Sequence, residues 1–347
     1  MGKETTADGK ITKMKTDIKT AFHSGDLGDL ILALPICREI GLVRMYVGSR
    51  PFTKEFTEDR YLAIKGLLEA QPYIESVILG EPGPVDYDFS TFRSGGMPWG
   101  KNIMDIQSDW VLKKTLEYKP WLTAGVDSAS KGRVIVHRSP RYRNPSFSWS
   151  SVVRKLGGRA LSICFPGEHK EMEDACGSKI ERLQLRDYLH LAELLNGCDF
   201  FVGNQSSPLA VATGLGCKTI QETCLWIPDC IYKGAPIQYV HNGSCMIDGE
   251  LIKSPTREEI QTNTTPPGGW IVKCPWSGLV HRGINFYMVT KSLMKSANLA
   301  KDAAEALIVS ENTDRVMNEF PTFMGNGAGS PGRLKKHLQS IGITDIV

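Results

Sequence analysis

The sequence predicts an α/β protein with two Rossmann-like domains that face each other across a cleft. A unit of apolar strand, polar turn and helix start occurs twice, about 180 residues apart. The first turn is at residues 23–29 (HSGDLGD), and the second unit runs from a strand at 199–204 (DFFVGN) into a turn at 205–208 (QSSP). The first helix keeps apolar residues at helical spacing until Gly41, and the second ends at Gly216. Because a helix start directs free N–H groups at the carboxyl edge of a sheet, each unit predicts a site for phosphate or sugar.

The bulk composition fits two ordinary domains. The chain has 347 residues, of which 41% are apolar and 23% charged. A net charge of +3 excludes strong attraction to nucleic acid or membrane from bulk charge alone, and leaves local basic patches open. No apolar stretch reaches the roughly 18–20 residues of a membrane span, and the N-terminus lacks a secretory signal. Nine scattered cysteines without a C-x-x-C pair favour reduced thiols, and we expect a cytoplasmic protein.

Four segments are predicted along the chain. They are a flexible N-terminus (1–16), an N-terminal acceptor-side domain (17–125), a C-terminal donor-binding domain (126–285), and C-terminal helices with a Gly-rich linker (286–347). A hinge is expected at 120–131, where small polar residues gather between the two domains.

The individual elements follow from periodicity. In the first domain we expect strands before His23 and at 44–47 and 76–79, helices after Asp29 and around 62–68, and connections near the cleft at 86–90 and 101–103. In the second we expect strands at 133–137, 159–165 and 218–220, and helices at 149–156 and after Pro208.

Several segments, in this order and spacing, resemble the lipopolysaccharide heptosyltransferases, which belong to glycosyltransferase family 9 and have the GT-B fold. Residues 25–29 (GDLGD) resemble the family's glycine-and-acid motif, and 204–210 (NQSSPLA) its donor-binding segment. Residues 166–171 (PGEHKE) and 186–195 resemble the Gly-x-Glu stretch and the helix before the donor strand. The resemblance covers roughly residues 17–225. It implies an inverting, nucleotide-sugar-dependent glycosyltransferase that needs no cofactor or metal, with a C-terminal helix returning to the first domain.

Asp29 is the candidate catalytic base. A sugar transferase needs a base for the acceptor hydroxyl, and Asp29 matches the acid that ends the family motif. The alternative is that Asp29 only caps its helix. Gly25, Asp26 and Gly28 are expected to shape the turn on the acceptor side, and Asp26 is the second candidate for the base. His23 borders this turn, where it either touches the acceptor or is satisfied locally at the strand end.

Gln205, Ser206 and Ser207 are the candidate donor-binding residues at the second helix start. Their N–H groups and hydroxyls suit a phosphate or ribose, and simple N-capping is the alternative. Here the sequence departs from the family, because Gln205 replaces an Asp and Ala210 replaces a His. These two changes put the family's usual nucleotide and sugar in doubt.

The basic loop 137–145 supplies three further donor-side candidates. The resemblance implies that Ser139, Arg141 and Arg143 stabilise the departing diphosphate, and the planar fork of arginine suits that role. The alternatives are a solvated loop, or a nucleic-acid surface with aromatic partners in 142–149. Glu168 matches an acid that related enzymes place on the donor ribose, and is otherwise an exposed charge.

The expected partners are a nucleotide-sugar donor and an acceptor that the sequence leaves open. A saccharide of the bacterial envelope and a hydroxylated base in DNA, as in phage glycosyltransferases, are both compatible with the resemblance. A binding module without catalysis and a GT-B-fold epimerase remain competing functions. Residues 334–338 (LKKHL) suit a peripheral contact with an anionic surface. The tripeptide 86–88 (DYD) imitates a metal-binding motif, and we interpret it as a turn at a strand end.

Overall fold

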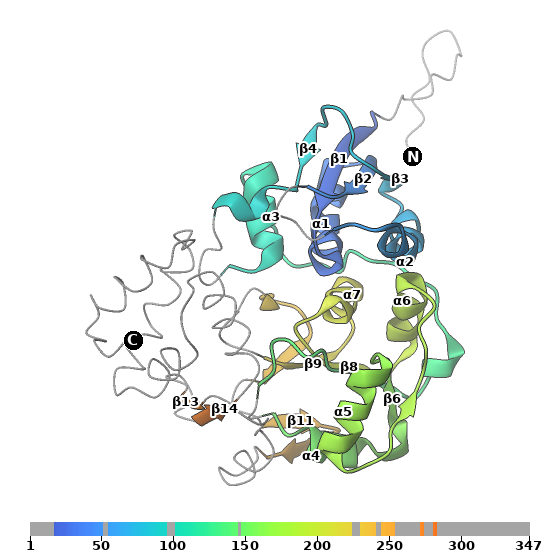
Figure 1. Cartoon of the computed structure of the whole chain (residues 1–347), viewed down its shortest axis with the longest axis vertical. Helices are drawn as coiled ribbons and strands as arrows, with labels where there is room; N and C mark the ends of the chain where they lie inside the picture. The colour runs from blue at the N-terminus through green and yellow to red at the C-terminus, as the bar shows by residue number, and fades with distance from the viewer. Residues whose placement is uncertain are drawn as a thin grey trace, which may run out of the picture.

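The computed structural model describes residues 17–50, 55–95, 101–144, 147–223, 230–240, 244–253, 271–273 and 280–282. Within them the chain forms two parallel sheets, one above the other in Figure 1. The first has the order β3-β2-β1-β4 and the second the order β10-β9-β8-β5-β6-β7. The α/β class and the parallel sheets are therefore confirmed.

The strands of the first sheet are β1 (Lys19–Ser24), β2 (Val43–Gly48), β3 (Ile74–Leu79) and β4 (Tyr87–Asp88). Those of the second are β5 (Val134–His137), β6 (Ala160–Ser162), β7 (Glu181–Arg182), β8 (Phe200–Asn204), β9 (Thr219–Glu222) and β10 (Ile237–Val240). Two antiparallel hairpins pair β11 (Cys245–Ile247) with β12 (Glu250–Ile252), and β13 (Ile271–Lys273) with β14 (Val280–Arg282).

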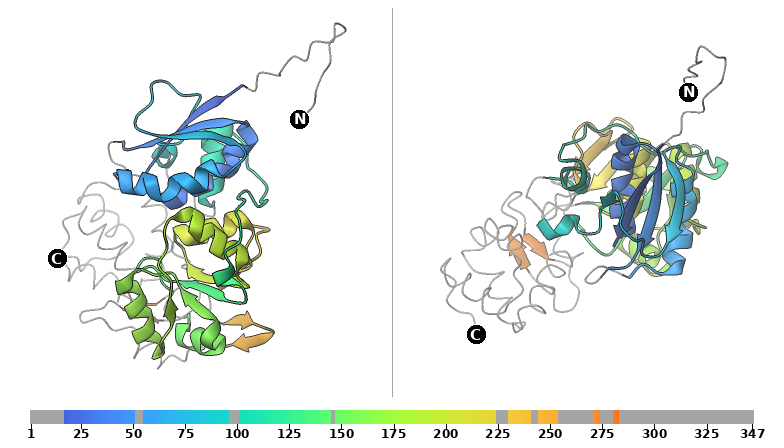
Figure 2. Two further views of the ribbon diagram at one scale, coloured as in Figure 1. Left: turned by 90° about the vertical axis from the view of Figure 1, so that its right-hand side faces the viewer. Right: turned by 90° about the horizontal axis from the view of Figure 1, so that it is seen from above.

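The helices are α1 (Leu27–Ile40), α2 (Glu58–Glu69), α3 (Ile103–Leu112), α4 (Trp149–Leu156), α5 (Pro166–Cys176), α6 (Tyr188–Gly197) and α7 (Ser207–Leu215). Four of them lie between the two sheets, where α1 packs on α7 and α2 packs on α6 (Figures 1 and 2). Helix α3 packs beside α1, and α4 and α5 contact each other in the second half.

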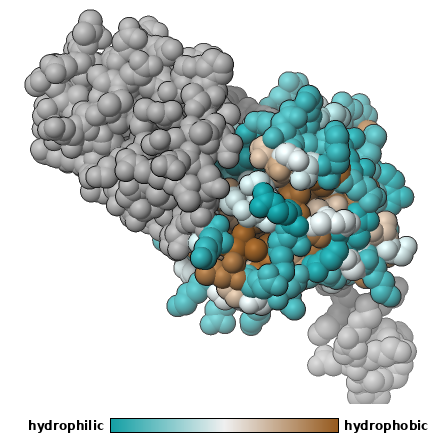
Figure 3. Space-filling view, turned by 90° about the horizontal axis from the view of Figure 1, so that it is seen from below, coloured by the Kyte–Doolittle hydropathy of each residue, from teal (hydrophilic) through white to brown (hydrophobic). Residues whose placement is uncertain are grey.

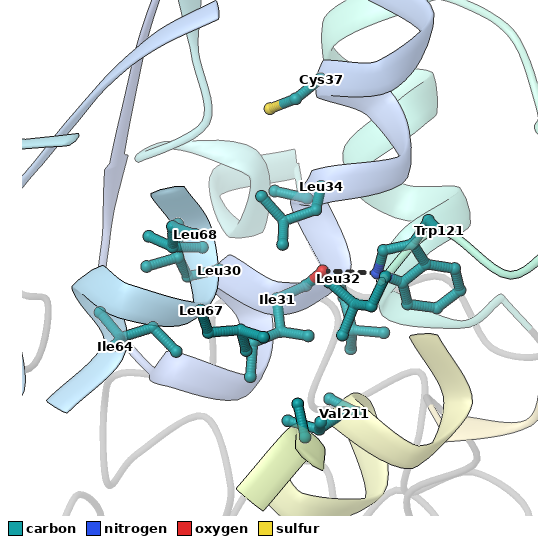
Figure 4. Close-up of a cluster of buried hydrophobic side chains, with 14 of the residues drawn as sticks. Leu30, Ile31, Leu32, Leu34, Cys37, Ile64, Leu67, Leu68, Trp121 and Val211 are labelled. Carbon is teal, nitrogen blue, oxygen red and sulfur yellow. Dashed lines mark hydrogen bonds between the residues drawn. The ribbon is translucent and has the colours of Figure 1, made fainter. Parts of the chain in front are cut away.

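We call the first sheet with α1–α3 the first half and the second sheet with α4–α7 the second half. One hydrophobic core joins these two halves. In Figure 4, Val211 of α7 points toward Ile31 and Leu32 of α1. Trp121, from the segment that links the halves, donates its indole N–H to the Ile31 carbonyl oxygen at 3.2 Å (Figure 4). Its backbone N–H also reaches the Gly214 carbonyl at 2.7 Å. The first part of the expected hinge is thus buried between the halves.

The alternation of side chains along β5 explains why the second sheet has helices on both faces. Ile135 points into the shared core, whereas Val134 and Val136 point into a second core with α4 and α5. Successive side chains of a strand face opposite sides of a sheet, so a continuous apolar run needs cover on both.

Strand order fixes where a ligand site is expected. In the second sheet, three strands lie on each side of the junction between β5 and β8, which is the order of a doubly wound nucleotide-binding sheet. In the first, the order reverses between β1 and β4. Ligands bind outside the carboxyl ends of the strands at such junctions. The turns after β1 and β8 are the two that the sequence singles out.

Two helices were not expected from the sequence. Residues 101–103 were interpreted as a connection, but Asn102 caps α3 and its side-chain oxygen accepts from the Asp105 N–H at 2.9 Å. Helix α5 begins at Pro166, inside the 166–171 stretch, for which the sequence predicts no helix. The other expected strands and helices up to β9 are present, with ends shifted by a few residues. The flexible N-terminus, the Gly-rich linker, the C-terminal helices and the 334–338 segment lie outside the described residues, and the domain boundaries stay a prediction.

The face of the described part that Figure 3 shows is mostly hydrophilic. Seen from below, Figure 3 shows hydrophobic side chains gathered into patches that polar residues surround. Within the described residues, no helix has both the length and the apolar character needed to cross a bilayer.

Candidate functional site

The starts of α1 and α7 face each other and form one cleft between the halves. Gly25 allows the tight turn after β1 because its φ is +105°, a conformation that other residues rarely adopt. Gly28, in the first turn of α1, lies so close to α7 that an added Cβ would be 3.6 Å from the Cα of Ser207. The polar side chains that line the cleft include Asp26, Asp29, Arg60 and Arg93 from the first half, and Arg141, Tyr188, Gln205, Ser206 and Ser207 from the second.

Asp29 is held by an arginine rather than by its own helix. The Arg93 guanidinium donates to Asp29 Oδ2 at 2.6 Å through Nη2 and at 3.3 Å through Nε. The N-cap of α1 is Asp26, so Asp29 does not occupy the capping position. Burial raises the pKa of the Asp29 carboxyl, and the nearby positive charge of Arg93 opposes part of that rise. The result is a buried carboxylate with raised proton affinity at the wall of the cleft.

Asp26 and Gly25 are fixed from α2. Arg60 donates to the Gly25 carbonyl oxygen at 2.7 Å, and its Nη2 lies 3.7 Å from Asp26 Oδ1. Asp26 makes no side-chain cap hydrogen bond to α1. The turn after β1 therefore owes its shape to Gly25 and Arg60, and Asp26 lines the cleft beside Asp29.

The side chain at the N-cap position of α7 does not cap the helix. Ser206 stands at the N-cap but makes no side-chain cap hydrogen bond; its Oγ donates to the Asn204 carbonyl at 3.0 Å. Ser207 Oγ lies 2.6 Å from the Tyr188 hydroxyl. Capping by Ser206, the alternative considered for this segment, is therefore absent. Ser206, Ser207 and the buried Gln205 all line the cleft.

Asn204 holds the basic loop against this helix start. Its side-chain nitrogen donates to the carbonyls of Ser139 at 3.0 Å and Arg141 at 2.6 Å, and its side-chain oxygen accepts from the Ser139 N–H at 3.0 Å. Tyr142 follows with a φ of +55°, so the backbone bends sharply there. Arg141 lines the cleft, and its positive charge acts on the Asp29 carboxyl across it.

The other two arginines of the loop are engaged elsewhere. Arg138 forms a two-pronged pair with the buried Glu222, at 3.0 and 2.9 Å. Arg143 pairs with Glu171 through both of its terminal nitrogens, with the longer contact at 2.8 Å. Neither Arg143 nor Ser139 is among the residues that line the cleft. Of the three loop candidates, the structure brings Arg141 to the site.

His23 and Glu168 also lie apart from the cleft lining. His23 is fully buried and stacks on Phe89 with ring centroids 6.0 Å apart, and burial lowers its pKa to about 4. Glu168 accepts from the Phe165 N–H at 3.1 Å and lies 4.0 Å from His137 Nε2. His137, Cys164 and Glu168 are residues of types that bind metal ions, and their potential ligand atoms lie close to one another. The expectation that no metal is needed stays a prediction.

Sequence reasoning missed three side chains of the cleft. Arg60 and Arg93 come from α2 and from a short helical turn after β4, outside any quoted motif. Tyr188 comes from α6, within the 186–195 stretch, but the sequence assigns it no role. Asn204 was part of a quoted motif but was not assigned a role. Tertiary packing brings Arg93 to Asp29 and Tyr188 to Ser207.

The arrangement places a base and an anion-binding surface on opposite walls of one cleft. Asp29 can accept a proton, while Arg141 and the N–H groups at the start of α7 can stabilise a developing negative charge. Such a pair suits the transfer of a group from a phosphate-bearing donor to a hydroxyl.

No protein-family model and no curated protein matches the sequence. Among solved structures, the chain is similar to a glycosyl transferase family 9 protein from Veillonella parvula, with 10% identity, a TM-score of 0.42, and 60% of this chain and 82% of that chain covered. It is also similar to the ADP-heptose lipopolysaccharide heptosyltransferase II of E. coli, with 12% identity, a TM-score of 0.44, and 67% and 92% covered.

A third similar structure is the iron-containing dodecameric glycosyltransferase TibC from enterotoxigenic E. coli, with 14% identity, a TM-score of 0.42, and 96% of this chain and 81% of that chain covered.

Proposed function

We propose that the protein is an inverting glycosyltransferase that moves a sugar from a nucleotide diphosphate to an acceptor hydroxyl. One observation carries the proposal: the buried carboxylate of Asp29 and the uncapped start of α7 line the same cleft, with Arg141 beside them. The resemblance of residues 25–29 and 204–210 to the motifs of family 9 supports the same assignment.

The proposed reaction is a single displacement. Asp29 takes the proton of the acceptor hydroxyl while the acceptor oxygen forms a bond to the anomeric carbon of the donor sugar. The bond from that carbon to the phosphate oxygen breaks, and its electron pair leaves with the nucleoside diphosphate. Arg141 and the N–H groups at the start of α7 stabilise that charge. Attack from the face opposite the leaving group inverts the anomeric configuration.

Each named residue has a distinct part in this proposal. Arg93 fixes the direction of the Asp29 carboxylate, and its positive charge limits the rise of the Asp29 pKa that burial causes. Ser207 and Tyr188 hold each other at 2.6 Å and offer hydroxyls to the donor. Gln205 and Ala210 replace two side chains of the family motif, so we propose a donor other than ADP-heptose.

The test is a screen of ADP-, UDP-, GDP- and CMP-sugars by thermal shift. A ligand at about 100 times its dissociation constant adds roughly 2.7 kcal/mol to stability. Donors that bind are then offered to envelope saccharides and to hydroxymethylated DNA, and released nucleotide and product are measured. Sugar transfer supports the proposal. Binding without turnover would favour the binding module, and interconversion of the donor sugar would favour the epimerase.

A further inference from the structure

We propose that His137, Cys164 and Glu168 form a site for a divalent transition metal, for which Zn²⁺ fits best. Their ligand atoms, one nitrogen, one sulfur and one oxygen, all lie within 4.8 Å of one another. On a tetrahedral Zn²⁺ with bonds of about 2.0–2.3 Å, ligand atoms are roughly 3.3–3.6 Å apart. The widest pair therefore needs to contract by about 1.5 Å at most for the group to close around an ion.

The three residues come from elements that the sheet already holds together. His137 ends β5, Cys164 follows the neighbouring strand β6, and Glu168 lies in the first turn of α5. His137 and Cys164 are buried, and the Glu168 side chain is 18% exposed. A site at the carboxyl ends of two paired strands is thus formed before any metal arrives, which lowers the conformational cost of binding.

Each ligand is oriented by a second contact, as ligands at metal sites generally are. His137 Nδ1 lies 3.3 Å from Ser206 Oγ, which leaves Nε2 directed at Glu168. Cys164 Sγ accepts from the Arg138 N–H at 3.3 Å, and Glu168 Oε2 accepts from the Phe165 N–H at 3.1 Å. These contacts hold the sulfur and the carboxylate oxygen in place at the site.

The chemistry of the ligands selects the class of ion. Imidazole with thiolate suits zinc and other first-row transition metals, whereas Mg²⁺ and Ca²⁺ prefer all-oxygen sites. A thiolate and a carboxylate together balance the two charges of the ion, and the thiol proton leaves to solvent on binding. The nearby cations Arg138 and Arg143 are paired with Glu222 and Glu171. These carboxylates offset the repulsion between the two arginines and the ion.

The metal would act on the structure of the donor side instead of on the reacting atoms. None of the three residues lines the cleft. The loop that carries Arg141 begins at His137, and His137 touches Ser206, so an ion there would fix both sides of the donor surface. The proposal stands apart from the glycosyltransferase assignment, whose family resemblance implies no metal.

The experiment uses the whole chain, stripped of metal and titrated with Zn²⁺ and with Co²⁺ as a spectroscopic probe. We expect one ion per chain, an absorption band from cobalt–thiolate charge transfer, and no competition by Mg²⁺. Cys164→Ser should abolish the band and weaken Zn²⁺ binding at least a hundredfold. Glu168→Gln, which keeps the side-chain shape, should also weaken it. Cys176→Ser is the matched control, because this buried thiol on α5 lies outside the group.

Circular dichroism of each variant shows whether it is folded, and the cobalt spectrum of the wild-type chain tests the site without any variant. The proposal is overturned if wild-type protein binds neither ion. It is equally overturned if Cys164→Ser and Glu168→Gln, both folded, bind Zn²⁺ as tightly as Cys176→Ser.

Discussion

Arg93 donates to Asp29 at 2.6 Å from a segment 64 residues further along the chain, and this pair forms one wall of the cleft. Two effects act on the carboxyl in opposite directions. Burial raises its pKa and the guanidinium lowers it, with burial the larger of the two. Arg93 is therefore a positioning residue that also adjusts the basicity of the proposed base.

Removing Arg93 should move the pH dependence of transfer. The base must be deprotonated, so the rate rises as pH increases through the pKa of Asp29. Arg93→Gln removes the charge that lowers this pKa, and we expect the acidic limb of the profile to shift to higher pH. Arg93→Lys keeps the charge and should shift it less. A profile of kcat/KM from pH 4 to 9 measures the shift, and identical acidic limbs in all three proteins would contradict the role of Arg93.

Arg141 should contribute to donor binding more than Arg143 does. Arg141 lines the cleft, whereas Arg143 is paired with Glu171 outside it. A hydrogen bond to a charged group is worth about 1.5–3 kcal/mol, so Arg141→Gln should weaken binding of the preferred nucleoside diphosphate roughly tenfold to a hundredfold. Arg143→Gln removes the same charge from the same loop and should change the dissociation constant less than threefold. Calorimetry compares the two, and equal losses would place both arginines on the donor.

The donor preference should differ from that of the heptosyltransferases. Gln205 and Ala210 line the cleft in place of the family's Asp and His, so the contacts of those side chains are absent. We expect ADP-heptose to bind at least tenfold more weakly than the best UDP-hexose or UDP-pentose. Parallel calorimetric titrations decide this. Micromolar binding of ADP-heptose, with no binding of the UDP-sugars, would contradict it.

His23 should make the protein less stable in mild acid. Its pKa is lowered from 6.5 to about 4 by burial, so between these values the unfolded chain binds a proton that the folded chain does not. Stability therefore falls as pH decreases from 6.5 to 4, by about 3 kcal/mol at most for this residue. His23→Phe places a third ring beside Phe89 and Phe92 and should remove that share of the loss. Urea unfolding at pH 7 and pH 4.5 measures it, and an unchanged loss in the variant would show that His23 is not the cause.

The sequence predicts those parts of the site that depend on local chain geometry. Asp29 and the 205–207 segment follow strands and open helices, and periodicity with turn residues is enough to find them. Arg60 and Arg93 reach the turn after β1 through contacts between distant segments of the first half, and Tyr188 reaches the cleft from α6 of the second half. No local sequence pattern encodes these tertiary contacts. The sequence also places Arg143 at the donor site, where the structure does not. A basic loop shows only that positive charges are present, whereas the ion pair with Glu171 that holds Arg143 outside the cleft is a tertiary contact.

The measurement that tests the central proposal most directly is turnover by Asp29→Asn with the donor and acceptor that the screen identifies. Loss of general-base catalysis should lower kcat by about 10²–10⁴, while the donor dissociation constant stays within threefold, because the base acts on the acceptor.

Asp59→Asn, which changes another first-turn acid outside the cleft, is the matched control and should keep wild-type kcat. A kcat of Asp29→Asn within threefold of wild type would contradict the proposal.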